Sequence, residues 1–347
     1  MVITDLLKVS PILNRCDEHQ GIADTIIAYY NGSFIVVTLV KLWQSNSMIL
    51  SENMRAALMM ALSMAAFTTN DALMKVASPN LPFFQQIVVR GIIITFGLFI
   101  LAAVWGHLKY RPNRKDLALT ALRTFAEIFS TIFFLTALFN ISLANLSAIL
   151  QALPLTVTLA AAIFQGENVG WRRLMAIGIG FIGVIIIIRP GMDGFNVYSL
   201  YGVAAVIGVT FRDLAARKLS KTIPSSRVAL SAALGVTVMA VIGSLVMQEQ
   251  WVMLSLSEWL LIGGASLCLI WGYVAAVASM RIGEIGFVAP FRYTSLLVAL
   301  FLGYVLLDEW PDGLTLIGAG IVVATGLFTI YRESKNASRT STGVRSS

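Results

Sequence analysis

Charged residues, cysteine and histidine are all scarce in this chain, and each scarcity excludes a class of protein. Aspartate, glutamate, lysine and arginine make up 12% of the 347 residues, against roughly a quarter in ordinary soluble proteins, so we expect most side chains to meet lipid. Cys16 lies in a polar segment and Cys268 in an apolar run, so no structural disulfide is expected. His19 and His107 lie outside the strongest apolar runs, which leaves no intramembrane imidazole for a metal site or general-base chemistry.

The net charge of +7 does not indicate a nucleic-acid-binding protein. Basic residues occur here in short clusters between apolar runs, whereas nucleic-acid binding gathers them on one face or one helix. Membrane topology explains the clusters better, because loops on one side of a bilayer concentrate lysine and arginine.

Ten apolar runs follow residue 52, each long enough to cross a bilayer as a helix. A hydrocarbon core of about 30 Å needs roughly 20 residues of helix. The predicted spans are 54–76, 83–105, 116–138, 141–164, 171–189, 198–219, 227–247, 257–280, 284–307 and 313–331. The connecting loops are short, so the sequence predicts an all-α integral membrane protein with about ten transmembrane helices and no soluble domain between them.

Lysine and arginine are distributed unevenly between alternate loops, which predicts the orientation of the protein. One side carries Lys109, Arg111, Arg114, Lys115, Arg172, Arg173, Arg217, Lys218, Lys221, Arg227, Arg281 and the tail residues Arg332, Lys335, Arg339 and Arg345. The other side carries only Lys75 and Arg189, at helix edges. We therefore expect a multi-pass protein of the cell inner membrane, with both ends of the ten-helix unit and the tail 332–347 in the cytoplasm.

Residues 1–52 form an amino-terminal extension for which two interpretations stay open. The stretch 26–43 is fairly apolar but is interrupted by polar residues, and it could form an eleventh span. Alternatively, Met48 or Met54 is the true start and the upstream residues are a mis-assigned extension. A cleaved signal peptide is not expected, because the order of basic, apolar and small residues is poorly met.

The chain contains an internal repeat, with residues 54–189 as the first five-helix repeat and residues 198–331 as the second. An acidic break at Glu167 and another at Glu309 each precede a glycine-rich run. Placing Glu167 on Glu309 defines what we call the repeat shift, which matches each residue of the first half to one of the second. Because five is an odd number, the second repeat must lie inverted relative to the first. Inverted repeats suit alternating access, although gene duplication in a scaffold would leave the same pattern.

With these features the chain resembles the drug/metabolite transporter superfamily, in its EamA-like branch. The resemblance covers residues 54–331 and rests on the two halves, the breaks Gly166-Glu167 and Asp308-Glu309, and the segment 137–144 that leads to Pro154. It implies a ten-helix transporter with both termini in the cytoplasm. It also implies a central cavity between the halves, lined mainly by helices 1, 3, 4, 6, 8 and 9.

The opening of the first helix is similar to that of a narrower group. Residues 66–75, AFTTNDALMK, resemble proteobacterial uptake carriers of the riboflavin and S-adenosylmethionine type. We therefore expect a secondary transporter that moves a small polar or planar metabolite by alternating access, with riboflavin uptake as the first prediction. Two alternatives stay open: import or export of amino acids or zwitterions such as S-adenosylmethionine, and a non-transporting membrane scaffold.

A polar stripe on the predicted helix 116–138 is the most informative candidate site. Its members recur at helical spacing, and they are Thr120, Arg123, Glu127, Ser130 and Thr131. Since an ionisable group at the bilayer centre costs about 3 kcal/mol, the stripe must face the interior of the bundle. Arg123 and Glu127 can pair directly, either as a substrate-contacting or proton-titrating carboxylate with a steering arginine, or as a structural ion pair.

Further ionisable groups lie in the apolar runs, namely Arg90, Arg212, Asp213 and Arg292. Arg90 and Arg292 have no acidic residue within one turn of their own helix, so each needs a partner from another helix or an anionic ligand. The alternatives for that partner are Glu127, Asp213 and Glu284. Together with Arg123, these arginines predict a rather basic cavity that suits carboxylates, phosphates or electron-rich rings.

The first predicted helix adds Asn70 and Asp71 to the candidate substrate contacts. Asp71 can instead form an interfacial ion pair with Lys75 at four-residue spacing. Three aromatic residues could stack on a planar substrate or serve in packing and interfacial anchoring, and they are Trp271, Tyr273 and Tyr293.

Two local patterns have structural explanations. The segment 178–183, GIGFIG, matches a dinucleotide-binding fingerprint, but it lies inside an apolar run without a preceding strand. It is better explained by close helix packing through small residues. Pro154 and Pro290 lie near corresponding points of the two halves and are predicted to kink their helices.

The sequence thus predicts a carrier and not an enzyme. Cys268 has no histidine nearby, so a nucleophile and base at reacting distance are not expected. We expect no cofactor and no metal. The expected partners are a small-molecule substrate and the lipid bilayer, without nucleic acid, and a second copy of the chain is a further candidate.

Overall fold

The computed structural model describes residues 51–104, 106–109, 112–167, 169–191, 195–220 and 222–343. The eleventh span considered for residues 26–43 lies outside these residues. Within the described residues, ten helices are long and apolar enough to cross a membrane. The predicted all-α membrane class with ten spans is confirmed.

The helices follow the predicted spans closely. The first half comprises α3 (Glu52–Ala77), η2 (Ser78–Asn80), α4 (Phe83–Val104), η3 (His107–Lys109), α5 (Arg114–Asn140), α6 (Leu143–Leu150), α7 (Leu153–Gln165) and α8 (Trp171–Ile188). The second half comprises α9 (Tyr198–Arg217), α10 (Ser225–Val246), α11 (Leu256–Ile282), α12 (Ile285–Val288), η4 (Ala289–Tyr293), α13 (Thr294–Leu307) and α14 (Gly313–Gly343).

Short polar side chains at the membrane faces fix where several helices begin. The side chains of Ser51, Asn113 and Ser142 each accept a hydrogen bond from a backbone N–H in the first turn of the following helix. Ser255 forms a capping box with Glu258 at the start of α11. Such caps satisfy the free N–H groups of a first helical turn, so the loops can stay short.

The fourth and ninth spans are broken, unlike the other eight. The fourth is divided into α6 and α7 at Gln151, just before Pro154, and the ninth passes through the 3-10 turn η4, which contains Pro290. Proline lacks an N–H and clashes with the preceding turn, so the breaks follow from the sequence. The continuous helices predicted over 141–164 and 284–307 are therefore corrected to interrupted ones, as the predicted proline kinks require.

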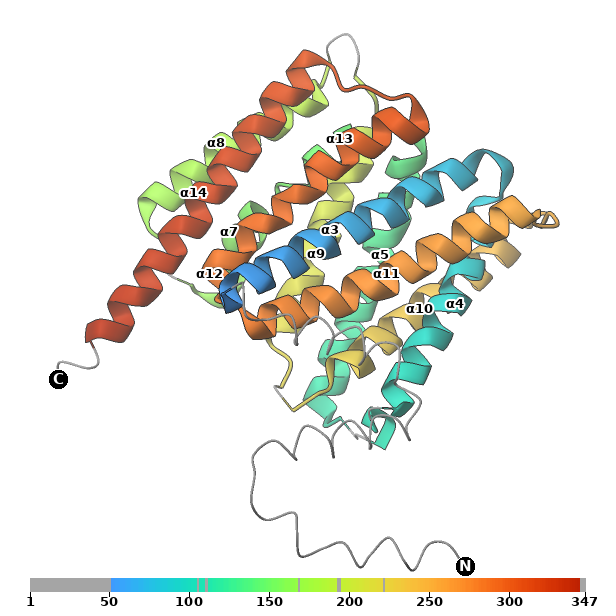
Figure 1. Cartoon of the computed structure of the whole chain (residues 1–347), viewed down its shortest axis with the longest axis horizontal. Helices are drawn as coiled ribbons and strands as arrows, with labels where there is room; N and C mark the ends of the chain where they lie inside the picture. Colours follow the sequence, from blue (N-terminus) through green and yellow to red (C-terminus); the bar gives the residue numbers. More distant parts are fainter. Residues whose placement is uncertain are drawn as a thin grey trace, which may run out of the picture.

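Each helix of one half packs mainly on a helix of the other half. The principal pairs are α3 with α11, α5 with α9, α4 with α10, and α8 with α14. Figure 1 shows α8 and α14 side by side along one edge, and α3 between α13 and α11. Exchanging the two halves leaves this set of pairs unchanged, which agrees with the inverted repeat.

Small residues allow the α8–α14 pair to approach closely. A Cβ atom on Gly183 would lie 2.9 Å from the carbonyl oxygen of Gly318, and one on Gly318 would lie 2.7 Å from the carbonyl oxygen of Gly183. The glycine-rich segment 178–183 is thus a packing surface inside a helix, as the sequence predicts.

The loops of the bundle fall on two faces. We call one the acidic face, because its loops carry Glu249, Asp308, Glu309 and Asp312. We call the other the basic face, because its loops and helix ends carry Arg114, Lys115, Arg172, Arg173 and Arg217. The positive-inside rule predicts that the basic face is cytoplasmic.

Candidate functional site

A central cavity of about 480 Å³ lies between the two halves. Its lining comes from α3 to α7 in the first half and from α9, α10, α11, η4 and α13 in the second. The resemblance implies a cavity lined by the first, third, fourth, sixth, eighth and ninth membrane spans, and all of them line it. The second and seventh spans, which are α4 and α10, also contribute. The lining includes nine of the predicted site residues: Asp71, Arg90, Arg123, Glu127, Arg212, Asp213, Tyr273, Arg292 and Tyr293.

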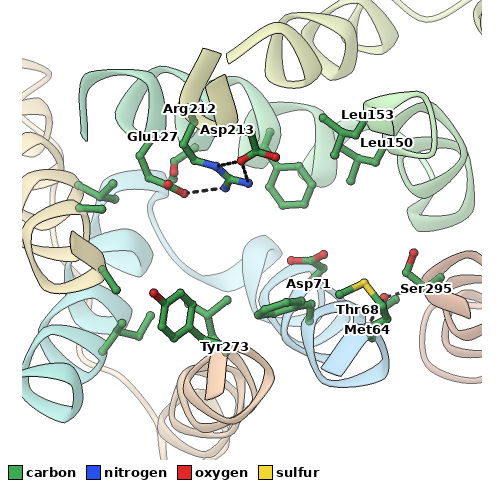
Figure 2. Close-up of a pocket in the computed structure, with 18 of the residues that line it drawn as sticks. Met64, Thr68, Asp71, Glu127, Leu150, Leu153, Arg212, Asp213, Tyr273 and Ser295 are labelled. Atoms are coloured by element: carbon green, nitrogen blue, oxygen red, sulfur yellow. Dashed lines mark hydrogen bonds and ion pairs between the residues drawn. The ribbon is translucent and has the colours of Figure 1, made fainter. Parts of the chain in front are cut away.

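One wall of the cavity carries a network of four charged side chains from α5 and α9. The Arg212 guanidinium lies 3.2 Å from the Glu127 carboxylate and 2.9 Å from the Asp213 carboxylate. Arg123 lies 3.7 Å from Glu127, which confirms the pairing predicted from their spacing. Figure 2 shows Glu127, Arg212 and Asp213 together on this wall. Arg212 therefore joins the two carboxylates, and Glu127 joins the two arginines.

The polar stripe of α5 is divided between the cavity and a helix contact. Arg123, Glu127 and Thr131 line the cavity, whereas Thr120 does not. Ser130 is buried and donates a hydrogen bond to the backbone oxygen of Glu127. A Cβ atom on Gly208 of α9 would lie 2.9 Å from the Ser130 side chain, so α9 packs closely over this part of α5.

The opposite wall carries Asp71, beside Thr68 and Met64 in Figure 2. The Asp71 carboxylate accepts a hydrogen bond of 2.8 Å from the Asn70 amide, and the Asn70 oxygen accepts one of 3.5 Å from Arg90. Asn70 is buried behind the cavity and does not line it. Its role is to connect Asp71 and Arg90, which come from different helices.

The interfacial pair considered for Asp71 and Lys75 does not form. Lys75 lies 2.6 Å from the Glu309 carboxylate instead. Its ammonium group also donates a hydrogen bond to the backbone oxygen of Ile141. Asp71 is thereby left at the cavity with Asn70 as its hydrogen-bond partner among the described residues.

Several polar atoms of the cavity lining are buried without a hydrogen-bond partner among the described residues. They are Nε of Arg90, Nη1 of Arg123 and the hydroxyl oxygen of Tyr293. Arg292 lines the same cavity, and within the described residues it makes no ion pair with Glu127, Asp213 or Glu284. Leaving such buried groups unsatisfied costs about 1–3 kcal/mol each.

The aromatic candidates divide into two groups. Tyr273 lines the cavity and donates a hydrogen bond to the backbone oxygen of Ser225, and Tyr293 also lines it. Trp271 lies outside the lining, and 39% of it is exposed on the outer surface of the bundle. Trp271 is therefore not a direct contact for a ligand in this cavity.

Sequence reasoning missed two polar residues near the helix breaks. The Gln151 amide, at the α6–α7 break, donates a hydrogen bond of 2.8 Å to the Ser295 hydroxyl, just after η4. Both residues line the cavity. Pro154 and Pro290 already mark the two breaks, so polar residues beside those prolines were the available signal.

The cavity brings side chains of both charges together in one lining. Four arginines and three carboxylates line the cavity, which leaves one positive charge in excess when all are ionised. Among the described residues, no group of three or more histidine, cysteine, aspartate or glutamate side chains is arranged to hold a metal ion. The chemistry available here is therefore ion pairing, hydrogen bonding and ring contact with a ligand.

The chain is similar to known carriers and to a protein of known structure, of which the following are examples. The chain is 26% identical over 280 residues to an S-adenosylmethionine uptake transporter of Rickettsia conorii, covering 80% of this chain and 93% of that protein. It is 29% identical over 193 residues to a riboflavin transporter of Vibrio cholerae, covering 55% and 64%. It is 23% identical over 279 residues to a pseudopaline exporter of Pseudomonas aeruginosa, covering 80% and 96%. A crystal structure superposes with a TM-score of 0.58 at 16% identity, covering 81% of this chain and 98% of that one, and it shares the fold.

The family model described as the EamA-like transporter family matches residues 54–189 and 197–331. Each match covers one five-helix half, so the predicted resemblance is confirmed. This chain belongs to the EamA-like transporter family and is a multi-pass membrane transporter of small molecules.

Proposed function

We propose that the protein is an uptake carrier for a small zwitterionic metabolite of the S-adenosylmethionine type. The observation that carries this proposal is the convergence of opposite charges from both halves on one cavity. Its volume, about 480 Å³, is typical of small-molecule sites, which span roughly 300–1,000 Å³. A non-transporting scaffold would have no need for these groups, because each costs about 3 kcal/mol in a bilayer.

The two walls offer complementary contacts for such a substrate. The side chains of Arg90 and Arg123 line the cavity, and their guanidinium groups suit a substrate carboxylate. Asp71 is free of any ion pair within 4.0 Å among the described residues, so it suits an ammonium or sulfonium group. S-Adenosylmethionine carries all three charges together with a planar ring.

Riboflavin is the second candidate, and a different observation favours it. The ring of Tyr273 lines the cavity and could stack on a planar, uncharged ring system. The Vibrio cholerae relative also supports it, although the match covers only 55% of this chain. Riboflavin leaves the charges of Asp71 and Arg90 without partners, so we place the zwitterion first.

Flux into proteoliposomes tests the proposal. Purified protein is reconstituted, and uptake of radiolabelled S-adenosylmethionine is measured beside uptake of riboflavin and methionine. Each substrate gradient is imposed in turn, inward and outward, so that the direction of transport is measured as well. We expect saturable uptake of S-adenosylmethionine that unlabelled S-adenosylhomocysteine inhibits. Flux no greater than in protein-free liposomes for every compound would support a scaffold, and saturable uptake of riboflavin alone would replace the proposed substrate.

Matched variants locate the site. Glu127→Gln and Arg123→Gln each remove one charge from the cavity network, and we expect each to lower kcat/KM about tenfold or more, the loss that corresponds to about 1.4 kcal/mol. Glu52→Gln is the control, because Glu52 is an exposed residue in the first turn of α3 and lies outside the cavity. Parental flux in both cavity variants would contradict the assignment of the site.

A further inference from the structure

Four charged residues outside the cavity tie helix ends to loops on the two membrane faces. On the acidic face, Lys75 at the end of α3 lies 2.6 Å from Glu309, and their side chains are only 10% and 24% exposed. The second carboxylate oxygen of Glu309 accepts a hydrogen bond of 2.9 Å from the backbone N–H of Leu143. Lys75 also donates to the backbone oxygen of Ile141. This pair therefore joins α3, the loop before α14 and the start of α6.

The basic face carries a second pair of the same design. Arg217 at the end of α9 lies 3.5 Å from Glu167 in the loop before α8, and their side chains are 46% and 50% exposed. The repeat shift that places Glu167 on Glu309 also places Lys75 on Arg217. The second pair is thus the first pair with the two halves exchanged.

Other contacts are also related by the exchange of the two halves, so the correspondence between Lys75–Glu309 and Arg217–Glu167 is part of a general pattern. Glu249 accepts hydrogen bonds of 2.9 Å from the backbone N–H groups of Phe84 and Gln85 on the acidic face. The repeat shift matches Phe84 to Ser226 and Glu249 to His107, and the side chains of Ser226 and His107 lie 2.7 Å apart on the basic face.

A further contact connects a residue with its own repeat mate. The hydroxyls of Thr95 and Thr237 lie 3.4 Å apart, and the repeat shift places one of these residues on the other. They therefore lie on the pseudo-two-fold axis that relates the halves. A contact on one face consequently has a geometric counterpart on the other face.

We infer that the pairs Lys75–Glu309 and Arg217–Glu167 are alternating latches, each of which holds one face of the carrier closed. The acidic-face latch is closed in this structure, because it is short, largely shielded from solvent and reinforced by two backbone hydrogen bonds. The basic-face latch is loose, because an exposed pair at 3.5 Å is screened by water and contributes little. The structure is therefore a state closed at the acidic face, and the opposite state tightens Arg217–Glu167 while it releases Lys75–Glu309.

This inference rests on the proposed transport by alternating access, but its test needs no substrate. A single cysteine is introduced as Thr131→Cys in the cavity, with Cys16→Ser and Cys268→Ala as background. A membrane-impermeant maleimide then labels it from either face, in proteoliposomes of defined orientation. A latch that is removed should expose the cavity at its own face and hide it from the other.

The two latches give opposite expectations. Glu309→Gln or Lys75→Gln should raise labelling from the acidic face and lower labelling from the basic face, whereas Arg217→Gln should do the reverse. We expect the ratio of acidic-face labelling to basic-face labelling to change about tenfold, which is the population shift that about 1.4 kcal/mol produces. Combining Glu309→Gln with Arg217→Gln should return the ratio toward its starting value.

Neighbouring charges provide matched controls. Asp308→Asn changes an exposed residue beside Glu309 whose left-handed backbone, at a φ of 53°, asparagine also accepts. Lys218→Gln changes an exposed residue beside Arg217. Both should leave the labelling ratio unchanged. Equal shifts in the same direction from Glu309→Gln and Arg217→Gln, or no shift from either, would overturn the latches, and this result stands apart from any failure of the S-adenosylmethionine uptake assay.

Discussion

Substitution of Gly183 by alanine should destabilise the protein through the contact between α8 and α14. A Cβ atom on Gly183 would lie 2.9 Å from the carbonyl oxygen of Gly318 and 3.0 Å from Cγ2 of both Ile321 and Val322. The backbone oxygen cannot rotate away, so the two helices must separate by a few tenths of an ångström. Overpacking of this kind costs about 1–3 kcal/mol.

Gly178 offers the matched control in the same helix. A Cβ atom there would meet nothing within 4 Å, so Gly178→Ala gains the helix propensity of alanine, up to about 1 kcal/mol, without a clash. Both variants gain this propensity, so the difference between their free energies of unfolding isolates the packing cost of about 1–3 kcal/mol.

Denaturant titration of the two purified variants in the same detergent measures the free energy of unfolding. We expect Gly183→Ala to be less stable than the parent and Gly178→Ala to be equal or more stable. Equal stability of the two variants would refute the close-packing explanation of this segment. Neither α8 nor α14 lines the cavity, so substrate affinity of the folded fraction should not change.

Two further predictions follow from the position of single residues. Tyr273→Leu should raise the KM for a substrate with a planar ring, whereas Trp271→Leu, a change on the outer surface, should leave it unchanged, and flux measurements on both variants check this. The hydrogen bond from Arg189 lowers the pKa of Asp312, outside the membrane spans, to about 2. The contribution of this contact to the stability of the fold is therefore complete above pH 3.8, the ordinary pKa, and is lost as the pH falls toward 2. Because Asp312 is about half exposed, solvent screening limits this contribution to about 1 kcal/mol or less. Asp312→Asn should remove this part of the acid unfolding curve, as circular dichroism in detergent would report.

The ten spans could be predicted because each depends on local composition alone. The predicted span 116–138 became Arg114–Asn140, which Asn113 caps. The pair Arg123–Glu127 was equally accessible, since four-residue spacing on one helix brings side chains together. Local patterns thus suffice where both partners lie in one element.

Contacts between residues far apart in the sequence could not be predicted by considering each helix separately. The four-residue spacing makes Asp71 a candidate partner for Lys75, but Glu309, which belongs to the other half of the chain, binds it instead. Glu127 similarly gains Arg212 from another helix. The repeat shift matches Lys75 to Arg217 and Glu167 to Glu309, so applying it to every charged residue would have placed the latch positions among the few like-charged matches without coordinates.

The same shift leads us to expect that a carrier with matching faces still binds its substrate in one orientation. It aligns Asp71 with Asp213, so both halves place a carboxylate at the cavity, but it aligns Asn70 with Arg212. In the first half the neighbouring amide connects its aspartate to Arg90, whereas in the second half the arginine binds both Asp213 and Glu127. The elements that open and close are therefore alike in the two halves while the walls that bind differ. The proposed zwitterion would meet an unpaired carboxylate on one wall and a neutralised one on the other, and we expect that difference in charge, not the fold, to set its orientation.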